Sequence, residues 1–332
     1  MMPVKRILRI GLALALTALA LWLSFRNVDW ADLRDAFRRV NYLYVAAAMA
    51  NSIFSVYALG WRWEILLRPQ CRISLGKLFR FNMVSQTINI VAPARMGEFA
   101  RAYLVSQEGC AAVSFTLGTI LVERLLDVFM FSVFWVATPA LMALKGPLSE
   151  HRAWLLLFIL PAVFLVSFSF APSVFLKSAD LFGRLFPLNA RARILGIVRQ
   201  GLEAFSSLRQ KKTLIRLLLW TAGLIFSQIL TNFILFKAFH LPLSLGPALV
   251  VLLAIQVGSL PPSAPGKIGV FEYSVILALA VFGIPRSDAL YYGLMLHLAV
   301  FLPKIVLGLI YFCGMDFRLR FLKESRKIAG KV

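Results

Sequence analysis

Residues 261–269 read PPSAPGKIG, and they interrupt an apolar region that extends from about residue 245 to residue 283. Proline cannot continue a helix because it lacks an N–H group and its ring clashes with the preceding turn, and glycine weakens a helix. We therefore expect two half-helices here, joined by a short irregular turn. The residues expected to form this turn are Pro265, Gly266 and Gly269.

A second apolar region, about 77–108, is interrupted in the same way. Residues 92–97 read APARMG and match residues 264–269, APGKIG, position by position, at an offset of 172 residues that is close to half of the chain. Each interruption carries one cation in the middle of an apolar region. The pair is interpreted as an internal repeat, with Pro93 and Gly97 in the first turn, and two unrelated proline kinks are the alternative.

Six further apolar spans run without interruption, and each reaches the roughly 17–25 residues that a helix needs to cross a bilayer. They cover residues 7–25, 42–61, 113–144, 153–171, 214–239 and 289–313. The chain of 332 residues is 60% hydrophobic, whereas soluble domains are usually near half. The sequence therefore predicts an all-α, polytopic integral membrane protein with about six full transmembrane helices and two re-entrant helical hairpins, not a soluble bundle.

Basic residues indicate the orientation of the chain. Lys and Arg number 36 against 15 Asp and Glu, for a formal net charge of +21. They gather in the N-terminus and in the segments 62–80, 172–213 and 314–332, the last being a basic tail. Basic loops stay on the cytoplasmic side of a membrane, so both chain ends are expected there. A nucleic-acid partner is not expected, because the basic residues lie between apolar spans.

This orientation makes the two interruptions enter the membrane from opposite sides. The first region would start from the cytoplasm and the second from outside, which is the inverted repeat that many transporters use. The chain is thus expected to be a single transmembrane domain, residues 1–332, with pseudo-repeats at about 42–144 and 214–313. The connectors 29–40 and 172–213 are amphipathic and are expected along the headgroup layer, although part of the second could instead bind a partner protein.

Two cations are predicted deep in the bilayer. Arg95 and Lys267 would sit at the tips of the two turns, where a charge costs roughly 2.5–3.5 kcal/mol on insertion scales and is usually functional. The half-helices that follow present partially positive N-termini, which favour an anion such as a phosphate. Glu98 and Glu272 would hold the cations or contact the positive part of a zwitterionic headgroup. The alternative is that both cations extend to an interface.

A second charged set lies in the span 113–144. Glu123 and Asp127 share one helical face, and Arg124 points about 100° away from it. Together with Arg101 they either line a cavity or form a structural ion-pair cluster. Arg62 lies between two tryptophans and is interpreted as an anchor at the membrane interface.

Three cysteines, Cys71, Cys110 and Cys313, are an odd and scattered set. They do not form a disulfide framework, and the topology places all of them on the cytoplasmic side, where thiols stay reduced. No P-loop, G-x-S-x-G or H-E-x-x-H motif occurs, and the three histidines lack metal-ligand spacing. We therefore expect no ATP site, no cofactor and no metal, and we interpret His297 as a packing residue.

Several of these residues form a recognisable pattern. The pattern consists of Trp61-Arg62-Trp63, Asn89, PARMGE at residues 93–98, Arg101, Glu123-Arg124, Asp127, Pro262-Ser263, Gly266, Gly269, Phe271 and Glu272. It resembles the lysylphosphatidylglycerol synthase transmembrane region family, also called the flippase-like domain or UPF0104 family. The resemblance covers about residues 5–315.

The resemblance implies lipid handling in a bacterial inner membrane. In two-domain relatives this region flips aminoacylated phosphatidylglycerol, which a soluble synthase domain makes. This chain shows no such domain. A separate lipid-synthesising enzyme is therefore the expected partner. Stand-alone members are similar to proteins implicated in hopanoid or isoprenoid-lipid transport. The function expected is thus a flippase for an anionic or isoprenoid-type lipid, without enzymatic activity. The alternatives are a membrane transferase or phosphatase acting on a lipid phosphate, and a non-transporting subunit of an envelope-biogenesis complex.

Overall fold

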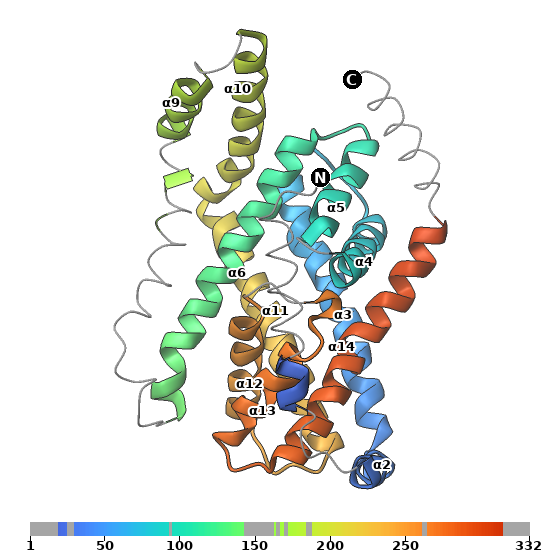
Figure 1. Cartoon of the computed structure of the whole chain (residues 1–332). Helices are drawn as coiled ribbons and strands as arrows, with labels where there is room; N and C mark the ends of the chain where they lie inside the picture. Colours follow the sequence, from blue (N-terminus) through green and yellow to red (C-terminus); the bar gives the residue numbers. More distant parts are fainter. Residues whose placement is uncertain are drawn as a thin grey trace.

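The computed structural model describes residues 19–24, 30–92, 95–142, 163, 167–168, 172–183, 188–260 and 264–314. All regular structure in this part of the chain is helical (Figure 1). The expected spans 7–25 and 153–171 lie mostly outside the described residues. The tail beyond residue 314, Pro93 and the Pro262-Ser263 pair lie outside them entirely.

Three helices of the described part are long and apolar enough to cross a membrane. They are α3 (Tyr42–Leu67), α11 (Lys211–Ala238) and α14 (Arg286–Gly314), and they correspond to three of the six expected spans. Asn41 begins α3, where its side chain accepts a hydrogen bond from the N–H of Leu43 at 3.1 Å. The N–H of Asn41 donates to the carbonyl of Ala238 at 3.0 Å, so α3 starts where α11 ends and the two helices run antiparallel.

A fourth long helix, α6 (Val113–Met142), has bounds close to the expected span 113–144. Its first half carries Glu123, Arg124 and Asp127. α6 runs in the same direction as α11, away from the end of the molecule at which α3 ends (Figure 1). Its charged half therefore faces the interior that α3 and α11 share.

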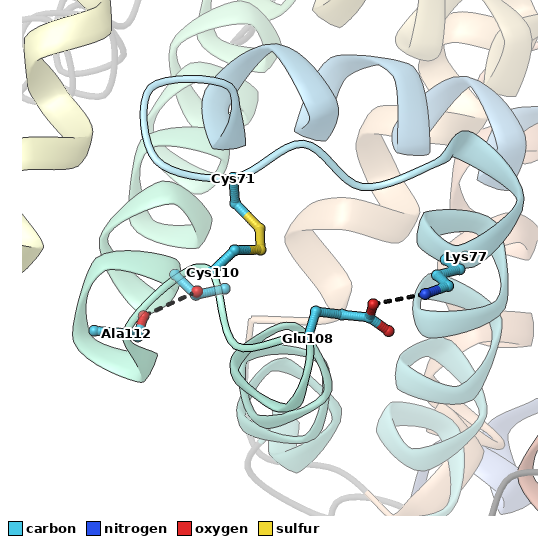
Figure 2. Close-up of a disulfide and its surroundings, with 6 residues drawn as sticks. Cys71, Lys77, Glu108, Cys110 and Ala112 are labelled. Carbon is cyan, nitrogen blue, oxygen red and sulfur yellow. Dashed lines mark hydrogen bonds and ion pairs between the residues drawn. A yellow bond between two sulfur atoms is a disulfide. The ribbon is translucent and has the colours of Figure 1, made fainter.

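The first interrupted region forms α4 (Leu75–Val91) and α5 (Met96–Gln107), which pack against each other. Their outer ends meet, because Nζ of Lys77 lies 2.6 Å from Oε2 of Glu108 (Figure 2). The two helices thus form a hairpin that starts and finishes at one end of the molecule. The helix break turns the chain back on itself, as the prolyl and glycyl residues predict.

A disulfide joins Cys71 and Cys110 across the base of this hairpin, with Cα atoms 5.2 Å apart (Figure 2). The expectation of three free thiols was therefore wrong. The sequence separation of 39 residues conceals the pairing, because only the return of α5 along α4 brings the two loops together. Cys313 is free and exposed.

The second interrupted region forms α12 (Leu245–Gly258), the short 3-10 helix η3 (Pro265–Lys267) and α13 (Val270–Ala280). α12 and α13 approach so closely that a Cβ atom on Gly258 would lie 2.0 Å from Oγ of Ser274. This hairpin starts and finishes at the opposite end of the molecule from the α4–α5 hairpin (Figure 1). Because η3 contacts α4, the two helix breaks lie close together.

The amphipathic connectors are helical as expected, but the second is not a surface helix throughout. α2 (Trp30–Arg39) lies at one end of the molecule, and α9 (Pro172–Gly183) and α10 (Leu188–Glu203) extend from the other (Figure 1). The chain continues as η2 (Ala204–Arg209), whose Phe205 and Leu208 are buried. The apolar face expected along the headgroup layer therefore packs partly into the protein core, against α6.

Two apolar clusters stabilise the two ends of the helical bundle. One contains Trp63, Phe115 and Phe205, near the end of α3 and the start of α6. The other contains Phe236 and Tyr292, near the end of α11 and the start of α14. Burial of side chains of this size contributes roughly 1.5–3 kcal/mol each in water, and in lipid their close packing takes over that role.

Candidate functional site

A cavity of about 300 Å³ lies among α3, α4, α6, α11, α12, α14 and the break that precedes α13. Its charged lining consists of Arg62, Arg124, Asp127, Lys267 and Lys304. Its amide lining consists of Gln86, Gln228, Gln256 and Asn232. This volume is at the lower end of the range for ligand pockets, and it suits a small polar group better than a whole lipid.

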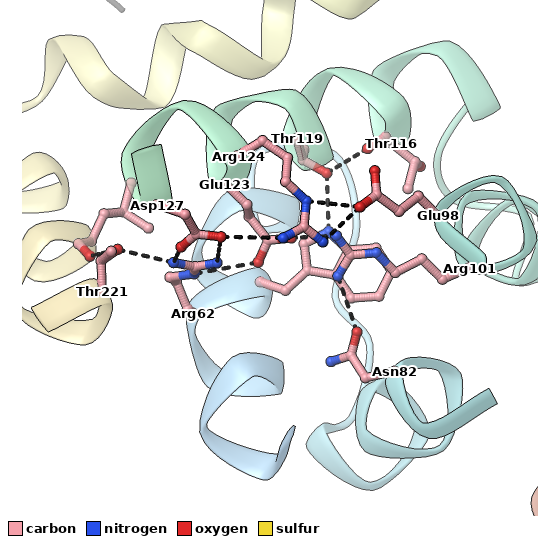
Figure 3. A network of polar contacts seen from close by, with 12 residues as sticks. Arg62, Asn82, Glu98, Arg101, Thr116, Thr119, Glu123, Arg124, Asp127 and Thr221 are labelled. Atoms are coloured by element: carbon pink, nitrogen blue, oxygen red, sulfur yellow. Dashed lines mark hydrogen bonds and ion pairs between the residues drawn. The ribbon is translucent and has the colours of Figure 1, made fainter. Parts of the chain in front are cut away.

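Three arginines and three carboxylates form a continuous network along one wall of this cavity (Figure 3). The arginines are Arg62, Arg101 and Arg124, and the carboxylates are Glu98, Glu123 and Asp127. The six side chains come from α3, α5 and α6. Among these six groups opposite charges are equal in number, and their contacts tie the three helices together. Arg95 lies at the edge of the network, 3.8 Å from Glu98, and adds one further positive charge.

Arg62 is at the centre of the network and not at an interface. Its Nη1 atom lies 2.5 Å from Oδ1 of Asp127, and its Nε atom lies 3.4 Å from Oε1 of Glu123. The side chain is only 1% exposed, which overturns its interpretation as an anchor. The neighbouring tryptophans explain the error: Trp61 is exposed, but Trp63 is fully buried and donates to Oγ1 of Thr119 at 3.0 Å.

Arg101 and Glu123 are buried beside the cavity and do not line it. Nη2 of Arg101 lies 2.5 Å from Oε2 of Glu123, and Nη1 donates to Oδ1 of Asn82 at 3.1 Å. The guanidinium also stacks over the ring of Trp63, at 4.4 Å from its centroid. The arrangement is that of a structural ion pair, although Nε of Arg101 and Oε1 of Glu123 are buried without a hydrogen-bond partner among the described residues.

Arg124 and Asp127 reach the cavity. Arg124 donates from Nε to Oε1 of Glu98 at 2.8 Å and contacts Oδ2 of Asp127 at 3.3 Å. Glu98 therefore holds a cation in place, as the sequence suggested, but the cation is Arg124. Because Arg124 is 35% exposed, its guanidinium keeps a free face toward the cavity.

Lys267 and Lys304 line the cavity from other elements, η3 and α14. Neither forms an ion pair with the described residues. The positive charge of Lys267 acts on Lys304, and those of Arg95 and Arg124 act on Lys267. Oγ1 of Thr87 donates to the carbonyl of Lys304 at 2.7 Å, which fixes this part of α14 against α4. Lys304 is not among the residues expected at the site from the sequence, although a lysine within the apolar span 289–313 was a detectable signal.

Arg95 lies next to the cavity but does not line it. Its positive charge acts on Lys267, so the tips of the two breaks do converge. Its side chain is 65% exposed, and its closest carboxylate contact is Glu98 at 3.8 Å. Of the expected headgroup cations, the structure therefore puts Lys267 and Arg124 in the cavity wall and leaves Arg95 and Arg101 outside it.

The helix N-termini at the breaks are occupied by the chain itself. Oε2 of Glu272 accepts from the N–H of Gly269 at 2.7 Å, and Oε1 lies 2.6 Å from Nδ1 of His297. Similarly, Oδ1 of Asn89 accepts from the N–H of Gly97 at 2.9 Å. These N–H groups are consequently not available to an anion, and Glu272 serves as a cap and a partner for His297.

The expected turn residues have specific backbone roles. A Cβ atom on Gly97 would lie 2.0 Å from the carbonyl oxygen of Ser85, so only glycine permits this approach of α5 to α4. Gly266 and Gly269 adopt positive φ angles of 73° and 84°, a region that favours glycine. Pro265 begins η3. A backbone N–H at this position would have no partner within the helix, so the lack of one in proline costs no hydrogen bond.

Long apolar helices around a charged interior cavity define an integral, multi-pass membrane protein. Comparison with known proteins agrees: the description "Lysylphosphatidylglycerol synthase TM region" matches residues 10–308. The chain belongs to this family. Within the described residues, no group of three or more His, Cys, Asp or Glu side chains is placed to hold a metal ion.

Two archaeal proteins are similar to the chain over most of its length. A UPF0104 membrane protein of Methanothermobacter thermautotrophicus is 26% identical over 282 residues, covering 77% of this chain and 80% of the relative. A second UPF0104 membrane protein, from Methanocaldococcus jannaschii, is 25% identical over 247 residues, covering 72% of this chain and 97% of the relative. No solved structure matches the chain.

Proposed function

We propose that the protein is a lipid flippase that carries an anionic headgroup through the interior cavity while the lipid tails stay in the bilayer. The observation that carries this proposal is the pair Lys267 and Lys304, two cations that face one cavity and lack an ion-pair partner among the described residues. Uncompensated charges inside a membrane protein are costly and mark substrate pathways. An anionic headgroup would supply the missing partner.

The two helix breaks support a transport mechanism. The α4–α5 and α12–α13 hairpins approach each other from opposite ends of the bundle, and Lys267 belongs to the second break. In transporters with inverted repeats, interrupted helices frame a central site that opens to each side in turn. On this proposal both hairpins are re-entrant in an inner (plasma) membrane, they enter it from opposite sides, and the cavity opens to one leaflet at a time.

The cavity lowers the barrier that makes unassisted flipping slow. Transfer of a polar group into hydrocarbon without hydrogen bonds costs roughly 2–7 kcal/mol, and more for a charged group. The amide groups of Gln86, Gln228 and Gln256 and the cations of the lining replace the water that the headgroup loses. We propose no chemical change in the lipid and no use of ATP.

Reconstituted vesicles test this proposal. Purified protein is placed in vesicles with fluorescent phosphatidic acid or phosphatidylglycerol, and dithionite quenches the label in the outer leaflet only. Wild type should expose the whole labelled pool, whereas Lys267→Gln should leave about half protected. Lys212→Gln, at an exposed lysine outside the cavity, is the matched control and should behave as wild type. Protection of half the pool by wild-type protein with every anionic lipid would refute the flippase.

The same vesicles separate transport from enzymatic activity. Mass spectrometry of the lipids after incubation should find each lipid unchanged in mass. A phosphatase or transferase would change that mass, and its detection would replace the proposed function with the enzymatic alternative. A non-transporting subunit would give neither a change in leaflet nor a change in mass.

A further inference from the structure

We propose that the cavity selects a lipid phosphomonoester, a headgroup with two negative charges, over phosphodiester and aminoacylated headgroups. This inference rests on the proposed function, because it names the substrate class of the same site. It depends on one juxtaposition: Lys267 and Lys304, which have no ion-pair partner among the described residues, line the same cavity as a network in which three arginines pair with three carboxylates.

The network of three arginines and three carboxylates offers little uncompensated charge to a ligand. Arg62 is held by Asp127 and Glu123, and Arg101 is held by Glu123 and Asn82. Both arginines are at most 2% exposed, so a ligand would have to break these contacts to reach them. A group entering the cavity can contact the free face of Arg124, but this arginine already shares Glu98 and Asp127.

The two lysines provide the uncompensated charge. Lys267 lies in the break before α13, and Lys304 lies on α14 one residue after Pro303. Both line the same cavity of about 300 Å³, so their like charges repel when both are protonated and the cavity is empty. A ligand with two negative charges would neutralise both and remove this repulsion. A single negative charge would leave one half-buried cation in the cavity without a partner, which is costly.

This charge count ranks the common headgroups. A phosphomonoester, such as the headgroup of phosphatidic acid or of an isoprenoid phosphate, has a second pKa of about 6 and carries about 1.5 to 2 negative charges at pH 7. A phosphodiester such as phosphatidylglycerol carries one. An aminoacylated phosphodiester adds a positive charge, which the lysines would repel. The expected order of affinity is therefore monoester, then diester, then aminoacylated diester.

Binding measurements at pH 7 test the order. Purified wild-type protein in neutral detergent is titrated calorimetrically with short-chain phosphatidic acid, short-chain phosphatidylglycerol and its lysyl ester. Phosphatidic acid should bind at least about tenfold more tightly than phosphatidylglycerol, since a hydrogen bond to a charged group is worth about ten- to a hundredfold in affinity. Inorganic phosphate and glycerol 3-phosphate provide the comparison with a free phosphate. If inorganic phosphate or glycerol 3-phosphate binds as tightly as phosphatidic acid, or more tightly, the inference that the ligand is a lipid would be overturned.

Variants connect the preference to the two lysines. Lys304→Gln and Lys267→Gln should each lower the affinity for phosphatidic acid to about the affinity for phosphatidylglycerol. The affinity for phosphatidylglycerol, which is already weaker, should change little. Lys212→Gln should keep the full preference, and a thermal melt of each variant checks that it is folded. An unchanged preference in both folded cavity variants would overturn the inference.

The two proposals fail in different ways. Vesicles that flip phosphatidic acid and phosphatidylglycerol at equal rates, together with equal affinities, would reject the selectivity and keep the flippase. Tight and selective binding of phosphatidic acid without any transfer between leaflets would reject the flippase and keep the selectivity.

Discussion

Arg95 and Lys267 occupy corresponding positions in the two helix breaks, and both adopt the left-handed backbone conformation, with φ angles of 53° and 58°. For a residue with a side chain this conformation costs roughly 1–2 kcal/mol relative to the right-handed one. Such strain persists only where the surrounding structure fixes it, and it concentrates at functional sites. The two cations at the breaks thus share both their charge and an unusual backbone geometry.

Lys267→Gly separates the charge of this residue from its backbone strain. Glycine adopts positive φ without a steric cost, so the variant should be at least as stable as wild type, by up to about 1 kcal/mol, in a thermal melt in detergent. Its lipid transfer should nevertheless fall about tenfold or more, because the cavity loses a cation. Lys267→Ala should lose as much transfer without any gain in stability. Transfer by the glycine variant at the wild-type rate would contradict the role of the charge.

Gly97→Ala should destabilise the α4–α5 hairpin. The new Cβ atom would overlap the carbonyl oxygen of Ser85 and would lie 2.7 Å from Oδ1 of Asn89. Overpacking of this kind costs roughly 1–3 kcal/mol, which a lowered melting temperature or yield would reveal. Gly76→Ala is the matched control, because nothing lies within 4 Å of its Cβ position in α4. Equal melting temperatures of the two variants would show that the close approach is absent.

Arg101→Met should be among the most destabilising changes in the network. It leaves the buried Glu123 with only the 3.4 Å contact to Arg62, and removal of one partner of a buried pair costs about 3–5 kcal/mol. The double variant Arg101→Met, Glu123→Gln should recover part of this stability, because the unpaired charge is removed. The surface pair of Arg38 with Asp35 is the comparison: Arg38→Met should change stability by less than about 1 kcal/mol. A double variant no more stable than Arg101→Met would contradict this prediction.

Thiol labelling checks the pairing of Cys71 with Cys110. Under denaturing but non-reducing conditions a maleimide should modify one cysteine, Cys313, and after reduction it should modify three. Cys71→Ser should lower the free energy of unfolding by about 2–4 kcal/mol under oxidising conditions and by much less under reducing ones. Three reactive thiols before reduction would exclude the disulfide.

The positions of the helices could be predicted from the sequence because they depend on local chemistry. Met96 begins α5 close to the expected end of the first break, and the bounds of α11, Lys211–Ala238, differ from the expected span 214–239 by a few residues. α3 extends to Leu67, beyond the expected limit of residue 61, because Arg62 is neutralised inside the bundle. Apolar spans and helix breakers were sufficient for this level of the fold.

Side-chain partners could not be predicted in the same way. The direction of Arg62 depends on how α3 is rotated about its axis, and its partners on α6 are 61 and 65 residues away in sequence. The disulfide depends on the return of α5 along α4. Lys304 is a different case, since a lysine inside an apolar span could have been selected from the sequence by the reasoning applied to Lys267.

The base of the α4–α5 hairpin is closed by one covalent tie, Cys71 with Cys110, and one ionic tie, Lys77 with Glu108. Its two legs cannot slide along each other, so the hairpin can move only as a stiff arm that pivots on the loops at its base. Any displacement of its tip must then be accommodated where the arm rests on α14. There a Cβ atom on Gly308 of α14 would lie 1.8 Å from Oγ1 of Thr87 of α4, so the two helices are in close contact at this point. A rocking motion of the hairpin would change this contact first.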